Sequence, residues 1–325
     1  LHASDRHNIN TRYVARDNSI LTTLFWGTRL DLALVSRLRL KGTLDNLLGK
    51  GGRWVTRKGF HAKDSGVENP ESADPLRSNP FLDARHFDAT CPVLDALTLR
   101  PFPDDIETVA KIPDNHIFEG PRILFVDGMT PARSIRAIFS DQPFSFKSSI
   151  GVISGPGADA DLLRFVAAFL HSSLVTYLQI LTAYQANFER ERVTLQDVKR
   201  LPFIVPERHN DPRRASAIVR EAASQLKKME KKRSLLQTGY DRGHFDALVF
   251  EYFCLDANEQ KRVQELANLV APNIQPSSYG RLLSPLTARP YQAALNDYVN
   301  AVVSALNRRR DVRKGYGEFI AEVRR

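Results

Sequence analysis

The chain has 325 residues, of which 42% are hydrophobic and 26% are charged, a globular composition with enough length for two or three domains. Its formal charge is +9 and its pI about 9.6, which favours an anionic partner, either nucleic acid or a membrane surface. The two cysteines, Cys91 and Cys254, lie far apart. Their spacing argues against a thiolate zinc site or a disulfide framework.

The sequence also argues against a membrane protein. No apolar run reaches the ~18 residues that a spanning helix needs, because Arg164, His171 and Gln179 interrupt the most apolar stretch. We find no signal-peptide pattern. Together with the sparse cysteines, these features predict a cytoplasmic protein without a membrane partner.

In chain order, the first predicted element is a polar arm over residues 1–18. A helix follows over Ile20–Leu40, and Gly27 weakens its middle. After a basic, glycine-rich loop, Trp54–Phe60 alternates like a strand. Residues 62–80 are rich in turn formers and predict a mobile loop.

The middle of the chain predicts a sheet and a long helix. Prolines in residues 91–118 favour irregular structure with short strands. Two strand signals stand at Arg122–Gly128 and Phe144–Ser154. Asp159 or Asp161 can then cap a long helix that ends near Tyr184.

The last third of the chain predicts helices. The predicted helices are Arg213–Leu236, which is strongly basic, Phe245–Phe253, a helix that begins at a capping-box-like Asp256–Glu259, and a helix over about Pro290–Asn307. The order of strands and helices indicates an α+β fold.

Cationic and polar residues cluster at the ends of the predicted strands and past the long helix. Guanidinium forks bind phosphate and guanine edges, amides pair with adenine, and aromatic rings stack on bases. The candidate DNA-binding residues are Arg122, Arg133, Arg136, Lys147, Ser148, Tyr184, Asn187, Arg190, Arg192, Lys199, Lys227 and Lys231. The alternatives are solvated strand ends and cations that face a helix dipole.

No pattern predicts a catalytic or metal site. Gly155-Pro156-Gly157 mimics a nucleotide-binding loop, but the third glycine is missing and Pro156 lacks an N–H, which favours a plain strand-to-helix turn. His86 with Asp88 and His244 with Asp246 lack a third metal ligand at a useful spacing. The phosphate-loop, zinc-protease and serine-hydrolase motifs are missing from the sequence.

The segment Pro121–Pro206 resembles the target-recognition region of adenine-N6 DNA methyltransferases of the TaqI-like and Eco57I-like restriction-modification group. The matching residues are the strand Arg122–Val126, the strand Phe146–Ile153, the Leu170-His171-Ser172-Ser173-Leu174 core and the Leu201–Pro206 exit, with Leu24–Asp31 and Phe245–Tyr252 as flanks. The resemblance implies a mixed-sheet recognition domain over residues 41–210. An arm and helix (1–40) would precede it, and a basic helical domain (211–325) would follow.

The chain departs from that family at the catalytic motif. The family's Asn/Asp-Pro-Pro-Tyr/Phe is represented only by Asn79-Pro80-Phe81, and the glycine motif for S-adenosylmethionine is missing. The resemblance therefore implies that this chain holds no cofactor and is not catalytic alone. The parent enzyme would use S-adenosylmethionine in a fused or separate methyltransferase domain.

The sequence thus predicts a module that recognises double-stranded DNA for a modification or restriction-modification enzyme of bacterial defence. Two alternatives stay open. One is a helical adaptor that binds an acidic protein through its basic helix and does not bind DNA. The other is a divergent enzyme that uses Gly155-Pro156-Gly157.

Overall fold

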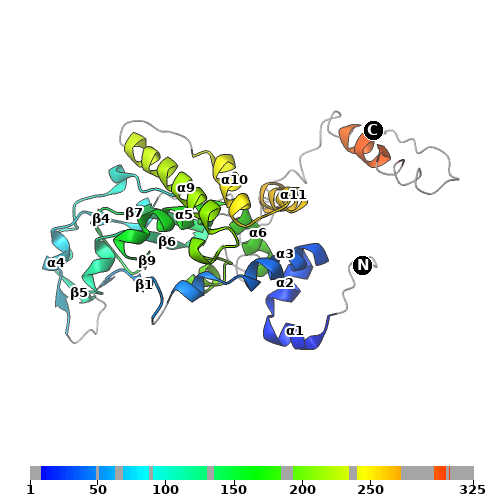
Figure 1. Cartoon of the computed structure of the whole chain (residues 1–325). Helices are drawn as coiled ribbons and strands as arrows, with labels where there is room; N and C mark the ends of the chain where they lie inside the picture. The colour runs from blue at the N-terminus through cyan, green and yellow to red at the C-terminus, as the bar shows by residue number, and fades with distance from the viewer. Residues whose placement is uncertain are drawn as a thin grey trace. The chain divides into compact units, whose positions relative to one another are not determined.

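The structure is a computed structural model that describes residues 9–48, 51–62, 69–87, 91–129, 135–183, 193–233, 240–271, 296–304 and 307. The chain divides into two compact units, Leu1–Ser278 and Tyr279–Arg325. In the second unit, residues 296–304 are helical, within the helix predicted over Pro290–Asn307. Figure 1 shows the elements of the first unit.

The first unit confirms the α+β class. Its helices are α1 (Thr11–Arg16), α2 (Ser19–Trp26), α3 (Arg29–Leu40), α4 (Asp74–Arg77), α5 (Ala160–His171), α6 (Ser173–Thr182), α8 (Leu195–Lys199), α9 (Pro212–Arg233), α10 (Arg242–Tyr252) and α11 (Ala257–Glu265). Its strands are β1 (Val55–Lys58), β2 (His61–Ala62), β3 (Glu71–Ser72), β4 (Phe81–Leu82), β5 (Thr108–Lys111), β6 (Arg122–Met129), β7 (Ile135–Ser140), β8 (Ser145–Phe146) and β9 (Ile150–Ser154).

A four-stranded sheet in the order β1-β9-β6-β7 lies at the centre, and each neighbouring pair of its strands is antiparallel. Successive side chains of a strand point to opposite faces. Ile123 and Phe125 of β6 therefore enter one hydrophobic core, while Leu124 and Val126 enter another. Most of β6, β7 and β9 is buried on both faces, which explains the apolar runs in these three strands.

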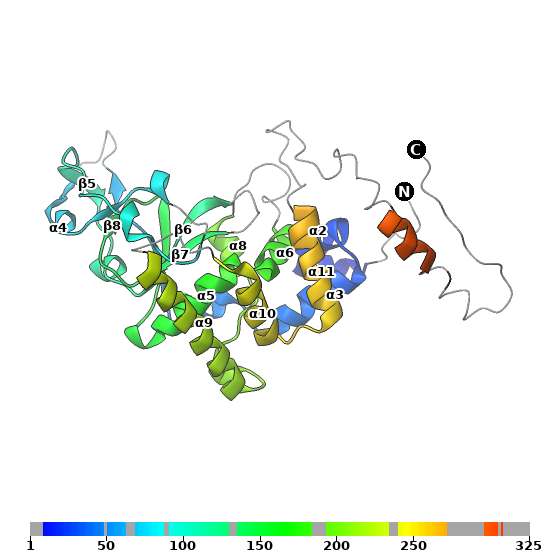
Figure 2. The same ribbon diagram turned by 90° about the horizontal axis from the view of Figure 1, so that it is seen from above.

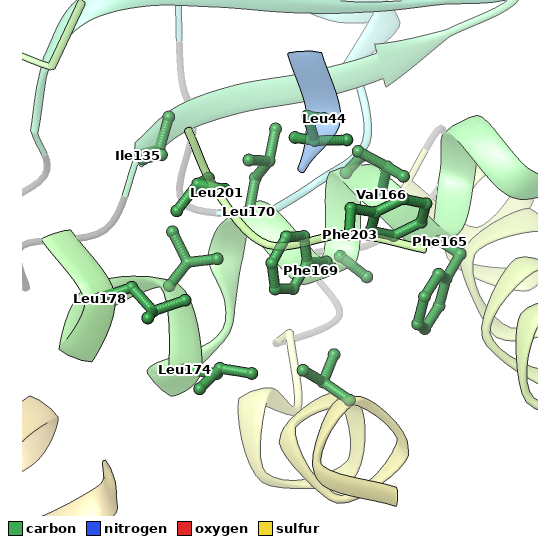
Figure 3. Close-up of a cluster of buried hydrophobic side chains, with 14 of the residues drawn as sticks. Leu44, Ile135, Phe165, Val166, Phe169, Leu170, Leu174, Leu178, Leu201 and Phe203 are labelled. Carbon is green, nitrogen blue, oxygen red and sulfur yellow. The ribbon is translucent and has the colours of Figure 1, made fainter. Parts of the chain in front are cut away.

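Helices cover one face of the sheet. Helix α5 packs on β6 and β7, and α9 packs on α5 (Figures 1 and 2). Phe165 and Phe169 of α5 meet Phe203, which follows the short helix α8 (Figure 3). The other face is covered by the small sheets β2-β5-β3 and β4-β8, whose core is rich in phenylalanine.

The helical core crosses the predicted domain boundaries after residues 40 and 210. Leu34 and Leu38 of α3 pack in the same core as α5, and so do Leu226 of α9 and Val249 of α10. One hydrophobic cluster therefore holds helices from both sides of each boundary, and the division into domains at these residues stays a prediction. The predicted mobile loop over residues 62–80 contains β3 and α4.

The predicted helix over Ile20–Leu40 is two helices, α2 and α3. Thr28 begins α3 with a capping box, in which its hydroxyl and Asp31 bond to each other's backbone N–H groups. A Cβ on Gly27 would lie 2.9 Å from an Asp31 carboxylate oxygen, so the chain needs glycine at this break.

The long helix predicted to end near Tyr184 is also two helices, because it bends by 61° at Ser172 between α5 and α6. Asp246 of α10 accepts hydrogen bonds from the backbone N–H of Ser173 at 2.7 Å and from its hydroxyl at 2.6 Å. No single described helix is long and apolar enough to cross a membrane, although the bent pair meets that test when its halves are counted together.

Candidate nucleic-acid interface

Arg122 cannot contact DNA in this fold, which corrects the prediction made for it. Its side chain is 0% exposed, and its guanidinium lies 4.2 Å from the centre of the Phe144 ring. Its Nη2 donates to the carbonyl of Gln142 at 2.8 Å. Burial lowers the pKa of the Arg122 guanidinium to about 9. Arg122 is therefore a core residue held by aromatic rings.

Three other candidate cations make intramolecular contacts at the surface. Arg136 donates to the carbonyl of Phe87 at 2.8 Å. Lys199 lies 3.3 Å from a carboxylate oxygen of Asp45, and Lys227 lies 2.7 Å from one of Asp161. Surface pairs of this kind contribute little free energy, so these contacts do not prevent the lysines from binding phosphate.

Several candidates fall outside the described residues. These are Arg133, Tyr184, Asn187, Arg190 and Arg192, and the side chain of Lys231. Their segments join described elements. Residues 130–134 connect β6 to β7, and residues 184–192 connect α6 to the stretch that begins at Val193.

A hollow of about 410 Å³ lies where β1, β6 and β9 meet the start of α8. Its lining residues are Thr56, Arg57, Lys58, Phe125, Asp127, Ser149, Gly151, Thr194, Leu195 and Gln196. We call it the β1–α8 hollow. Residues 184–192 end two residues before Thr194, which lies in its wall. Lys147 and Ser148 directly precede Ser149 in the wall.

The β1–α8 hollow combines cations with hydrogen-bonding groups. Arg57 and Lys58 are exposed. The hydroxyl of Thr56 is buried and has no hydrogen-bond partner among the described residues. A Cβ on Gly151 would lie 2.5 Å from the Phe125 ring, so glycine is what allows this ring to cover β9. With two cations and one carboxylate, that of Asp127, the lining has a net positive charge, and it includes a hydroxyl that lacks a partner among the described residues.

Sequence reasoning missed Arg57, Lys58 and Thr56, since Trp54–Phe60 was interpreted as a strand and nothing more. A usable signal was present, because adjacent Arg and Lys side chains in a strand place a cation on each of its faces. Which of these cations remain in solvent then depends on the residues that pack against the strand.

The Gly155-Pro156-Gly157 turn is structural. Asp159, at the start of α5, bonds both Nε and Nη2 of Arg53, at 2.6 and 2.5 Å, and accepts from Nε1 of Trp54 at 2.8 Å. Burial raises the pKa of Asp159, but the hydrogen bonds from Arg53 and Trp54 outweigh it, so this pKa lies below its ordinary value. The carboxylate that follows the turn thus ties α5 to the segment before β1.

Asp159→Asn should lower the free energy of unfolding by about 1.5–3 kcal/mol, because charge-assisted hydrogen bonds to a nearly buried carboxylate are lost. Urea unfolding followed by circular dichroism measures the change. Asp45→Asn is the matched control. It breaks the exposed pair with Lys199 and should cost less than about 1 kcal/mol. Equal costs for the two variants would contradict this role for Asp159.

Of the two His-Phe-Asp pairs, only His244 with Asp246 lies wholly within the described residues. Asp246 bonds Ser173, as described above, and Asp88 lies outside the described residues. Within the described ranges, no three His, Cys, Asp or Glu side chains are grouped so that they could hold a metal ion.

No protein-family model matches the chain, and no curated protein matches it. Among solved structures it is similar to the crystal structure of an HsdS subunit from Thermoanaerobacter tengcongensis, at 14% identity and a TM-score of 0.25. The match covers 76% of this chain and 55% of that one, so the chain spans about half the length of the subunit. A similarity of this size establishes neither a shared fold nor a shared function.

Proposed function

We propose that this chain recognises the sequence of double-stranded DNA for an adenine-specific DNA methyltransferase or restriction-modification enzyme of the cytoplasm. The observation that carries the proposal is the β1–α8 hollow. It places exposed Arg57 and Lys58 beside polar side chains at the end of the central sheet. The net charge of +9 supports an anionic partner.

The proposed interface would make two kinds of contact with DNA. Arg57, Lys58 and Lys147 would bind phosphates, which supplies affinity and register but no sequence information. Gln196 and Ser149 of the hollow would face base edges, which specify the sequence. The predicted readers Arg133 and Asn187 would add further base contacts from the segments that follow β6 and precede Val193.

Methyl transfer would take place in a fused or separate catalytic domain, which would bind S-adenosylmethionine. The role of this chain would be to hold the duplex in register while that domain extrudes the target adenine. Holding the duplex needs a rigid support, and the doubly covered sheet beneath the hollow supplies it.

The double variant Arg57→Ala/Lys58→Ala tests the proposal. We expect its affinity for duplex DNA at low salt to fall about tenfold or more. The slope of log K against log salt should fall by about 1.8, since each phosphate contact contributes about 0.9. Fluorescence anisotropy with a labelled duplex over a salt titration gives both quantities.

Arg12→Ala/Arg29→Ala is the matched control, because it removes two exposed cations from α1 and α3. It should leave the slope nearly unchanged. Equal losses in the two double variants would indicate attraction by net charge alone.

If the wild-type chain bound no duplex at low salt but captured an acidic protein after nuclease treatment, the adaptor function would replace the proposed one. The exposed cations Arg213, Arg220 and Lys228 of α9 fit that alternative.

A further inference from the structure

A second hollow, of about 760 Å³, lies beside β4 on the phenylalanine-rich side of the central sheet. It is lined by Arg77, Ser78, Asn79, Pro80, Ala96, Leu99, Arg100, Pro101, Phe102 and Asp104. We call it the Arg100 hollow. Two of its residues are guanidinium cations and one is a carboxylate, so its lining has a net positive charge.

Arg100 is held by its backbone, and its side chain remains in solvent. Its N–H donates to the carbonyl of Phe81 at 2.9 Å, and its own carbonyl accepts from the N–H of Phe81 at 2.7 Å. Its side chain makes no ion pair with any described residue. A fixed backbone with a free guanidinium is well suited to a bidentate contact with phosphate.

Arg77 forms the more rigid side of the hollow. Its Nη2 donates to the carbonyl of Ile106 at 2.9 Å, and its guanidinium lies 6.0 Å from the centre of the Phe102 ring. Its Nε is 3.7 Å from a carboxylate oxygen of Asp74, which is itself exposed. Arg77 thus presents an oriented positive charge beside the exposed hydroxyl of Ser78.

Strand pairing connects this hollow to the β1–α8 hollow. Arg100 pairs with Phe81 of β4, and Phe81 pairs with Ser145 of β8. Two residues beyond Ser145, Lys147 pairs with Phe60, which follows β1. Neighbouring strands lie about 4.8 Å apart and each residue along a strand adds about 3.3 Å, so three pairings and four residues of strand place Arg100 within about 28 Å of the end of β1.

A third hollow adjoins the Arg100 hollow. It shares Ala96 with the Arg100 hollow, but it carries the carboxylates of Asp141 and Glu230. Arg164, the cation between them, lies 2.7 Å from Asp141 and 3.2 Å from Glu230, so its charge is already paired with carboxylates and is not available to a phosphate. The charges therefore favour an anionic chain that runs from Arg100 towards β1.

We infer that the Arg100 hollow binds a backbone phosphate of the duplex that occupies the β1–α8 hollow. This inference rests on the proposed function and extends it. Arg100 and Arg77 bind the phosphate oxygens, and Ser78 donates a further hydrogen bond. Because phosphates are the same in every sequence, this contact adds affinity and no specificity.

Arg100→Ala in the full chain tests the inference. We expect its affinity for duplex DNA at low salt to fall about three- to tenfold, by the same factor for several unrelated duplexes. The slope of log K against log salt should fall by about 0.9. Arg100→Lys, which keeps the charge, should recover most of the slope. An unchanged melting temperature would show that the variant folds.

Arg12→Ala, an exposed cation on α1, is the single-charge control. If Arg100→Ala behaved like Arg12→Ala while Arg57→Ala/Lys58→Ala still lost binding, the inference would be wrong and the proposed function would stand. A loss for one duplex sequence and not for others would also overturn it, since that is base reading. A wild-type chain that binds no duplex would overturn both.

Discussion

Phe169→Ala should lower the free energy of unfolding of the first unit by about 3–5 kcal/mol. Phe169 is fully buried in α5 and lies near Phe203 (Figure 3), with 5.9 Å between the two ring centres. The ring centre of Phe253 lies 5.0 Å from that of Phe169. Truncation removes the transfer free energy of the ring and leaves a cavity among elements that cannot close around it.

Urea unfolding of the Phe169→Ala variant, followed by far-UV circular dichroism, measures this loss. Leu40→Ala is the matched control, because Leu40 is 87% exposed at the end of α3. It should change stability by less than about 0.5 kcal/mol. A cost below about 1 kcal/mol for Phe169→Ala would show that α5 is not the centre of the core.

Acidification should destabilise the fold through His171. Burial lowers the pKa of this imidazole from its ordinary 6.5 to about 4, although the carbonyl of Ala137 at Nε2 favours the protonated form. Above pH 6.5 the imidazole is neutral in both the folded and unfolded states. Between pH 6.5 and 4 the imidazole of His171 is protonated in the unfolded state but stays neutral in the folded state. His171 therefore removes up to about 3 kcal/mol of stability as the pH falls through this window.

The variant His171→Gln isolates this effect, because an amide can still donate to Ala137 but does not titrate. Urea midpoints for both proteins should be measured from pH 7.5 to 4. The stability of the wild type should fall relative to the variant by about 1.4 kcal/mol for each pH unit below 6.5. Parallel curves would refute the assignment.

The comparison with the variant is needed because other groups titrate in the same window. Burial raises the pKa of Glu230 and of Asp246, although hydrogen bonds from Arg164 and Ser173 oppose it. A carboxyl with a raised folded pKa stabilises the fold as the pH falls. Its contribution has the opposite sign to that of His171 and cancels in the difference between the two proteins.

The sequence predicted correctly those elements whose signal lies within a few consecutive residues. The strand at Arg122–Gly128 was found because its run of β-branched and aromatic side chains is buried on both faces. The capping box at Asp256 and Glu259 was found because both partners lie within one turn. The same rule at Thr28 and Asp31 could have divided the first long helix.

The helix at Arg213–Leu236 was located correctly as α9, but its environment was not. The sequence analysis recognised this helix only by its strongly basic charge. In the structure, α9 also buries Ala215, Ile218, Ala222 and Leu226 against the helical core. A search for large apolar side chains does not register alanines, although small alanine side chains allow α9 to pack closely on α5.

By itself, the sequence determined the α+β class, the approximate positions of the central strands and α9, the basic charge and the lack of a complete catalytic motif. Tertiary structure alone decided which cations face solvent. The sequence suggests a surface position for Arg122, but in the fold its guanidinium packs on Phe144. Nothing in the sequence distinguishes Arg57 and Arg100, which line hollows in the folded chain. Periodicity is a property of neighbours along the chain, whereas burial depends on residues that are distant in sequence.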